Sequence, residues 1–234
     1  MNFALVLAAG SGTRMNNKQP KQFLMVNNKP LFYYSVESFN RNKDIDAIVI
    51  VTNNEYIEQV QNWCIEYNLC KVKSVVKGGQ TRQESVYNGL QELSKIVDNP
   101  KDLVLIHDSA RPLVAQRIIN ENISVGKEFG AADTVIHATD TIIKSKNEKT
   151  IDEILNRSEL YQTQTPQTFE FGIIKNAHER AKIDNIPDVT DDCKLVLHYG
   201  KDVHFVMGDK FSFKVTTPED LEILKMIIKP NDDK

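Results

Sequence analysis

The residues best suited to binding an anion gather in one loop near the N-terminus. An apolar run at 2–8 leads into small residues at 9–13, then Arg14, and Lys21 follows a short distance on. Small residues let backbone N–H groups approach an anion closely, and two fixed cations suit the roughly four negative charges of a triphosphate. The spacing matches neither the Walker A loop nor the G-x-G-x-x-G loop, because Met15 stands where the third glycine belongs. The loop therefore favours a triphosphate over a dinucleotide, and its alternative is a tight turn with surface charges.

Paired glycines mark a second candidate loop. Gly78 and Gly79 follow a predicted strand and precede a predicted helix, on which Arg82 and Ser85 are three residues apart. Without a Cβ, the chain can lie close to a flat group such as a base. Helical spacing lets Arg82 and Ser85 face the same pocket. A plain strand–helix turn is the alternative, and this segment alone favours neither.

A third loop combines a carboxylate with a guanidinium. Asp108 and Arg111 follow the predicted strand that ends at His107. They could hold a metal ion and a phosphate respectively, or simply form a salt bridge with each other. Ligands of parallel sheets bind at the carboxyl ends of the strands, which favours the functional interpretation. His107 itself is expected to be a packed strand residue.

Two charged residues near the C-terminus extend this set. Lys214 interrupts an apolar stretch, so its side chain either reaches along the surface to solvent or points at a phosphate. Asp209 is close to Lys214 in the sequence and could join Asp108 on a metal ion, or could cap a turn. Spacing leaves both choices open.

The elements that must position these residues alternate in type. Predicted strands lie at 2–8, 45–52, 72–76, 103–107, 132–138 and 203–207, and predicted helices at 30–39, 54–67, 80–93, 115–129, 170–182, 191–198 and 218–228. This order predicts an α/β fold, with a Rossmann-like, mostly parallel sheet and helices on both of its faces. The candidate loops would then meet at one edge of the sheet.

Residues 140–167 interrupt the alternation. A polar stretch at 144–150 separates two β-like runs, at 141–143 and 160–165. We interpret 140–167 as a protruding β-arm within a single domain that spans 1–234. An arm that cannot bury itself commonly pairs with a copy of itself, so a homodimer is expected.

Composition restricts the class of protein. Of 234 residues, 41% are hydrophobic and 26% charged, and the net charge is −3, which predicts a globular protein and argues against a nucleic-acid partner. No apolar run approaches the roughly 20 residues of a membrane span. Three cysteines without a CxxC pair, and an N-terminus unlike a signal peptide, predict reduced thiols in a cytoplasmic protein.

In order and along nearly the whole chain, the motifs resemble the 2-C-methyl-erythritol 4-phosphate and ribitol 5-phosphate cytidylyltransferases. The matching segments are the glycine loop with Arg14 and Lys21, Gly78-Gly79 with Arg82 and Ser85, His107 to Pro112, Asp140-Thr141, Gln164 to Gln167, Thr190 to Asp192, and Lys214 to Pro218.

This resemblance implies a glycosyltransferase-A-like nucleotidyltransferase fold and transfer of CMP from CTP to a polyol phosphate, with Mg²⁺. It implies catalytic roles for Arg14, Lys21 and Lys214. The implied nucleotide contacts are Ala8, Ala9, Gly10, Gly12, Thr13, Gly78, Gly79, Arg82, Ser85 and Ser109. The implied polyol phosphate contacts are Asp108, Arg111, Thr141, Lys214 and, reaching over from the partner subunit, Arg157. Metal contacts are expected at Asp108 and Asp209.

Sequence details favour ribitol 5-phosphate as the acceptor, and hence CDP-ribitol for a cell-wall or capsule polymer such as teichoic acid. Leu7-Ala8-Ala9, 130–142, 161–164 and 192–194 resemble the ribitol branch. In contrast, Ala9 by itself stands where many enzymes of the ribitol branch have glycine, and the segment 85–90 resembles the methylerythritol branch. The methylerythritol branch, which belongs to isoprenoid biosynthesis, is therefore the alternative.

Two readings from other classes are disfavoured. A nicotinamide-dependent oxidoreductase lacks support, because the third glycine is missing and Glu37, the nearest acidic candidate for a ribose, falls inside a predicted helix. A non-catalytic binding protein would have no need to retain Arg14, Lys21, Asp108 and Lys214 together.

Overall fold

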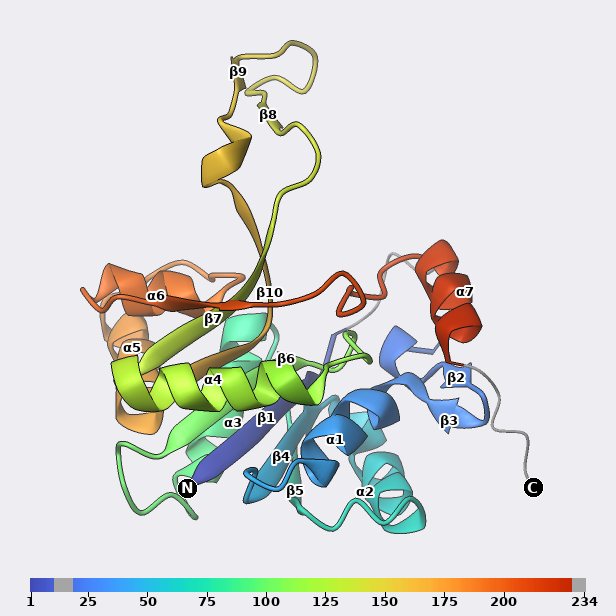
Figure 1. Cartoon of the computed structure of the whole chain (residues 1–234). Coiled ribbons are helices and arrows are strands. Elements are labelled where there is room, and N and C mark those ends of the chain that lie inside the picture. The colour runs from blue at the N-terminus through green and yellow to red at the C-terminus, as the bar shows by residue number, and fades with distance from the viewer. Residues whose placement is uncertain (11–18, 229–234) are drawn as a thin grey trace.

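A computed structural model describes residues 1–10 and 19–228 and is built around a seven-stranded sheet (Figure 1). Side by side, its strands are β11 (His204–Met207), β7 (Ala131–His137), β10 (Tyr161–Glu170), β6 (Leu103–Asp108), β1 (Asn2–Ala8), β4 (Ala47–Thr52) and β5 (Val72–Lys77). All neighbouring pairs are parallel except those that β10 makes with β6 and β7. The predicted mostly parallel sheet is therefore confirmed.

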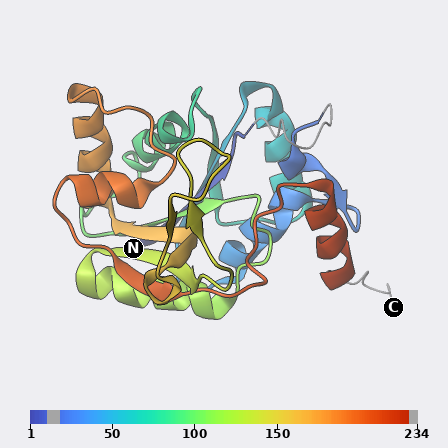
Figure 2. The ribbon, with the colours of Figure 1, turned by 90° about the horizontal axis from the view of Figure 1, so that it is seen from above.

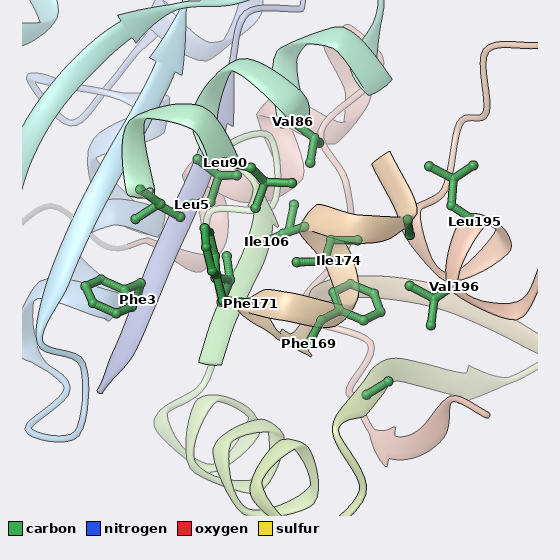
Figure 3. Close-up of a cluster of buried hydrophobic side chains, with 14 of the residues drawn as sticks. Phe3, Leu5, Val86, Leu90, Ile106, Phe169, Phe171, Ile174, Leu195 and Val196 are labelled. Atoms are coloured by element: carbon green, nitrogen blue, oxygen red, sulfur yellow. The ribbon is translucent and has the colours of Figure 1, made fainter. Parts of the chain in front are cut away.

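Helices cover both faces of the sheet, as predicted, because successive strand residues point to opposite sides. Phe3 and Leu5 of β1 pack in one cluster with helices α3 (Arg82–Leu93), α5 (Phe171–Ile183) and α6 (Asp192–His198) (Figure 3). Ala4 and Val6 pack in a second cluster with α1 (Leu31–Arg41), α2 (Ile57–Glu66) and α4 (Gln116–Phe129). The rigid double-sided core fixes the strand ends from which the candidate loops emerge.

Local signals in the sequence set several helix ends. Thr81 accepts a hydrogen bond from the Glu84 N–H and so begins α3. Gly130 ends α4 with φ of +83°, a conformation that glycine adopts without steric cost. The predicted helix at 54–67 is divided into a 3₁₀ turn, η3 (Asn54–Tyr56), and α2.

The predicted arm at 140–167 needs one correction, which concerns β10, the strand that begins within its second β-like run at 160–165. It continues to Glu170 and enters the middle of the sheet. The segment reads as exposed because Gln164, Thr165 and Gln167 are polar, yet all three are buried. The fold pairs most of their polar atoms internally: the Thr165 hydroxyl lies 2.9 Å from His107 Nδ1 and Gln164 Nε2 donates to the Asp209 carbonyl at 2.9 Å, while Gln164 Oε1 is buried without a partner among the described residues. A bulge around Pro166 interrupts the pairing with β7.

The outer part of the predicted arm does project from the sheet (Figure 1). It carries β8 (Ile143–Lys144), paired with β9 (Glu153–Ile154), and the 3₁₀ turn η4 (Arg157–Glu159). Seen from above, it stands between α5 and α6 on one side and α7 on the other (Figure 2). The paired residues Ile143 and Ile154 are exposed.

A smaller unit lies beside the main sheet. The hairpin of β2 (Met25–Val26) and β3 (Lys29–Pro30) shares an apolar cluster with α7 (Pro218–Ile227), whose first turn is fixed by a capping box between Thr217 and Asp220. All three cysteines are free thiols, as predicted. Within residues 1–10 and 19–228, every helix is too short or too polar to cross a bilayer.

Candidate functional site

A cavity of about 480 Å³ opens where β1, β4, β5 and β6 end. Its walls are Leu7, Ala9, Gly10, Lys21, Gln22, Asn53, Gly79, Gln80, Thr81, Arg82, Ser85, Asp108, Ser109, Ala110, Lys214 and Thr216. Nine of the residues predicted from the sequence are therefore brought together: Ala9, Gly10, Lys21, Gly79, Arg82, Ser85, Asp108, Ser109 and Lys214. The expected meeting of the strand-end loops accounts for their convergence.

The exit from β1 is held by a side chain from the following segment. The buried Gln22 donates from Nε2 to the carbonyl oxygens of Ala8, at 2.6 Å, and Gly10, at 3.0 Å. Ala8 itself is buried and is not among the residues that line the cavity. Gly12, Thr13 and Arg14 lie outside the described residues.

Lys21 reaches the cavity from the 3₁₀ turn η2 (Lys21–Phe23). The turn is anchored because Phe23 is fully buried, with its ring centroid 4.5 Å from that of Tyr56. Lys21 Nζ donates to the carbonyl oxygen of Val215 at 2.7 Å. This bond ties the lysine to the segment that carries Lys214, 193 positions later in the chain, and brings the two cations to one cavity.

The glycines after β5 are required by close packing. A Cβ on Gly78 would lie 2.6 Å from the Ala9 Cβ and 2.9 Å from the Ser85 hydroxyl oxygen. The Gly79 N–H donates to the same hydroxyl at 3.1 Å, and the hydroxyl donates to the Thr81 carbonyl at 2.9 Å. The first turn of α3 is thus held directly against the end of β1.

Asp108 is surrounded by cations. Its Oδ2 accepts a hydrogen bond from Lys214 Nζ at 2.6 Å, and its Oδ1 lies 3.7 Å from Arg82 Nε. Burial alone would raise the pKa of this carboxyl, but Arg82 and Lys214 outweigh burial and hold the pKa well below its ordinary value. Asp108 is therefore ionised throughout the physiological range and fixes the two cations at the cavity.

Arg111 does not form the alternative salt bridge with Asp108. Its NH1 donates to the Ser212 carbonyl at 2.7 Å and its NH2 to the Thr163 carbonyl at 3.3 Å. Among the residues that the structure describes, its Nε is a buried donor without a partner. Burial lowers the pKa of Arg111. The guanidinium is placed beside the cavity wall by backbone carbonyls and keeps donor capacity.

His107 is a packed strand residue, as expected. It is fully buried between the Arg111 carbonyl, 3.0 Å from Nε2, and the Thr165 hydroxyl, 2.9 Å from Nδ1. Burial lowers the pKa of His107 to about 4, so the ring is neutral at pH 7. With both nitrogens engaged, it is unsuited to proton transfer in the cavity.

The sequence model of the family described as 2-C-methyl-D-erythritol 4-phosphate cytidylyltransferase matches residues 3–230. This chain belongs to that family. A 2-C-methyl-D-erythritol 4-phosphate cytidylyltransferase of Clostridium botulinum is 42% identical over 229 residues, which is 97% of each chain. A ribitol-5-phosphate cytidylyltransferase of Vibrio parahaemolyticus is 40% identical, over 97% of this chain and 96% of its own length.

Solved structures of the cytidylyltransferase family share the fold. The 4-diphosphocytidyl-2C-methyl-D-erythritol synthase of Anaerococcus prevotii superposes with a TM-score of 0.81, at 26% identity, over 97% of this chain and 95% of its own. The 2-C-methyl-D-erythritol 4-phosphate cytidylyltransferase of Thermus thermophilus gives a TM-score of 0.76, at 26% identity, over 97% and 98% of the two chains. The resemblance inferred from the motifs is confirmed at the level of family and fold.

Six predicted site residues of this cytidylyltransferase, within the described part of the chain, do not line the cavity: Ala8, Gly78, Arg111, Thr141, Arg157 and Asp209. Thr141 and Arg157 lie on the exposed arm, where Arg157 NH1 donates to the Thr139 carbonyl at 3.1 Å. Asp209 accepts a hydrogen bond from the Ser212 N–H at 2.9 Å, the turn-capping role that spacing had left open. Its pairing with Asp108 on a metal ion gains no support from this placement.

Other cavity features were missed by sequence reasoning. Gln22 and Thr216 lie inside motifs already noted for their lysines, and a buried glutamine next to Lys21 gives no sign in the sequence that it clamps a loop. Asp192 was noted only as part of the family motif. It binds Arg82 at 2.6 Å across 110 positions of the chain, a contact that only the fold creates.

The expected Mg²⁺ would need oxygen ligands from the side chains around the cavity. Across residues 1–10 and 19–228, no three His, Cys, Asp or Glu side chains gather in a way that could hold a metal ion. Asp108 is the one carboxylate among the cavity-lining residues of that part, and both of its oxygens face cations. These side chains do not form a protein cage for Mg²⁺.

Proposed function

We propose that this chain transfers CMP from CTP to a polyol phosphate, with ribitol 5-phosphate as the acceptor and CDP-ribitol and pyrophosphate as products. A phosphate oxygen of the acceptor attacks the α-phosphorus of CTP, and the bond between that phosphorus and the β-phosphate bridging oxygen breaks. The observation that carries the proposal is the cavity itself, where Lys21, Arg82 and Lys214 border one space at the carboxyl edge of the sheet.

The chemistry of the acceptor fits a site without a general base. A phosphomonoester has its second pKa near about 6 and is mostly a dianion at pH 7, so it needs no deprotonation. The buried His107 has its pKa lowered to about 4 and both ring nitrogens are engaged. What such a reaction requires is positioning of two anions and stabilisation of developing negative charge, which fixed cations supply.

The nucleotide is assigned to the glycine-lined half of the cavity. Gly79 and Ser85 line this wall, and Gly78 lets the chain after β5 pack closely against Ala9 at the end of β1. A cytosine ring and its ribose would lie there, and the triphosphate would point toward Lys21 and the end of β1. This orientation sets the α-phosphate between Lys21 and the Asp108–Lys214 pair.

The acceptor is assigned to the side of Asp108, Arg111 and Lys214. Backbone carbonyls hold the Arg111 guanidinium close behind Asp108 in the chain, and Lys214 is 38% exposed at the cavity. We further propose that the arm completes this side in a homodimer, with Thr141 and Arg157 meeting the polyol phosphate in the partner's cavity. The exposed apolar residues Ile143 and Ile154 support pairing of two arms.

The choice of acceptor is supported by sequence details of the ribitol type, such as Leu7-Ala8-Ala9, and by the 40% identity to the Vibrio parahaemolyticus relative. 2-C-methyl-D-erythritol 4-phosphate is the second candidate, because the family description and the 42% identical Clostridium botulinum relative name it.

The deciding experiment measures pyrophosphate release from CTP with each polyol phosphate in parallel. We expect kcat/KM to be higher with ribitol 5-phosphate. A higher value with 2-C-methyl-D-erythritol 4-phosphate would transfer the assignment to the second candidate, and release with neither would reject the proposed activity.

A further inference from the structure

A line of five charged or titratable side chains runs from the buried contact between α5 and α6 into the cavity. His178 Nε2, on α5, lies 2.9 Å from Asp192 Oδ1, on α6. Asp192 Oδ2 accepts a hydrogen bond from Arg82 NH1, on α3, at 2.6 Å. Arg82 Nε lies 3.7 Å from Asp108, which in turn is bound by Lys214. Arg82, Asp108 and Lys214 line the cavity, but His178 and Asp192 do not.

The first two residues of this line, His178 and Asp192, are buried. The side chains of His178 and Asp192 are each 1% exposed, whereas that of Arg82 is 22% exposed and faces the cavity. Burial alone would raise the pKa of Asp192, but Arg82 and then His178 outweigh it and lower that pKa. A buried carboxylate is costly unless it is paired and hydrogen-bonded, so the site must hold both partners in place.

The backbone around Asp192 is fixed from two sides. The neighbouring Asp191 caps α6 by accepting a hydrogen bond from the Cys193 N–H at 2.8 Å. The Asp192 N–H itself donates to the Gln167 side-chain oxygen at 3.3 Å. Asp192 is therefore a rigid anchor, while Arg82 has a long, flexible side chain that could adopt many rotamers in its absence.

Arg82 is placed between two carboxylates that compete for it. Asp192 holds NH1 in a short hydrogen bond, while Asp108 is left at ion-pair distance from Nε. Asp108 can then keep its own short bond with Lys214, at 2.6 Å. Without the charge of Asp192, Arg82 would be drawn to Asp108, where it would compete with Lys214 and leave the nucleotide wall.

We propose that Asp192 and His178 are positioning residues: Asp192 holds the Arg82 guanidinium at the nucleotide side of the cavity, and His178 orients Asp192. Neither touches substrate, and both act through Arg82. The inference rests on the proposed use of CTP. It predicts that α5 and α6, which do not line the cavity, affect nucleotide affinity through Arg82.

The first test is Asp192→Asn, which keeps the shape and removes the charge. Calorimetric titration with CTP should give a dissociation constant raised about 10- to 100-fold, the range for losing a charge-assisted hydrogen bond. The KM for CTP should rise in parallel, and the KM for the polyol phosphate should stay near the wild-type value. Asp188→Asn, an exposed acid a few residues away, is the matched control and should bind CTP normally.

A double-mutant cycle separates positioning from general damage. If Asp192 acts through Arg82, then Asp192→Asn combined with Arg82→Gln should bind CTP no more weakly than Arg82→Gln alone. Independent, additive losses in the cycle would overturn the proposal, as would equal effects of Asp192→Asn on both substrates.

His178 supplies a second route that does not depend on the folding of the Asp192 variant. His178→Gln retains an N–H donor that can reach Asp192, whereas His178→Leu does not. CTP affinity should be near normal in the first and reduced in the second, with circular dichroism confirming that both are folded. Equal affinities would reject the role of His178. Failure of the wild-type protein to bind CTP would instead reject the proposed function.

Discussion

The cavity and the arm hold predicted site residues in opposite ways. At the cavity, Asp108 and Arg82 are enclosed by the sheet and two helices, and each has at least two charged neighbours. On the arm, Thr141 and Arg157 are exposed, and Arg157 donates to the Thr139 carbonyl at the base of the arm. Under the proposed assignment, the difference teaches that one chain supplies most of the nucleotide side by itself, whereas the arm's residues would meet the acceptor only in a partner's cavity.

The root of the arm, unlike its exposed tip, is held by hydrogen bonds between side chains, as the cavity is. Thr163 of β10 donates to Asp133 of β7 at 2.9 Å, and Gln167 Nε2 lies 3.1 Å from the same carboxylate and 2.8 Å from Asp191. The arm therefore starts from a hydrogen-bonded polar cluster in which Asp133 and Gln167 are buried and Thr163 is exposed. Four experiments would break or sharpen this contrast.

The largest effect is expected at Lys21. Lys21→Ala removes a cation from the nucleotide side, and turnover should fall about 10²- to 10³-fold, as for loss of one preorganised donor in an active site. Steady-state pyrophosphate release measures the effect, and an unchanged thermal midpoint would separate it from misfolding. Near-normal turnover would remove Lys21 from the mechanism.

Arg157→Ala tests whether the arm contributes to binding. We expect the KM for the polyol phosphate to rise about 10- to 100-fold, the cost of one charged hydrogen bond, and the KM for CTP to change much less. Lys149→Ala, which removes a cation from the exposed tip of the same arm, is the control. Equal losses for both substrates would contradict the acceptor-side role of Arg157.

The double change Ile143→Glu and Ile154→Glu tests pairing between copies. These paired, exposed side chains would place like charges in an arm–arm contact, so sedimentation equilibrium should show a dimer converted to monomers. The thermal midpoint should move little, because the residues lie outside the core. Ile65→Glu, at an exposed position on α2, should leave the assembly unchanged.

The smallest effect concerns Asp133, at the root of the arm. Burial raises the pKa of Asp133 from 3.8 to about 6, although hydrogen bonds from Gln167 and Thr163 favour its charged form. The folded state therefore binds the proton more tightly than the unfolded state, and this group's contribution to stability falls as pH rises from about 4 to about 6.

Asp133→Asn can still accept both hydrogen bonds and carries no charge. The free energy of unfolding at pH 7 should rise by on the order of 1 kcal/mol, and its dependence on pH between 4 and 6 should flatten. Denaturant titrations at several pH values would measure both. An unchanged pH dependence would show that Asp133 titrates normally.

Much of the framework could be predicted from the sequence because it depends on local signals. Periodicity located the strands and helices, and the rule that ligands bind at strand ends brought Lys21, Asp108 and Lys214 to one edge. The course of β10 could not be predicted, because its buried polar residues form hydrogen bonds with partners that are distant in the sequence, such as His107 and Asn122.

The same limit explains what was missed or misplaced in the site. Arg82 was found because it follows a glycine pair, but Asp192 could not be linked to it, since the two residues are 110 positions apart and only the fold brings α3 and α6 together. Asp209 is near Lys214 in the sequence, yet its carboxylate serves a local turn. Proximity along the chain was a poor guide wherever the sheet reorders the strands.

Strand β10 has a consequence for how two copies would influence each other. It starts at the foot of the arm, runs between β7 and β6, and its Thr165 hydroxyl accepts a hydrogen bond from the Asp108 N–H at 3.2 Å. Through this bond, and past the bulge around Pro166, β10 links the foot of the arm to the backbone of the carboxylate that organises the cations. In the proposed homodimer, contacts made by the arm and the placement of charges at the cavity would therefore depend on the same strand.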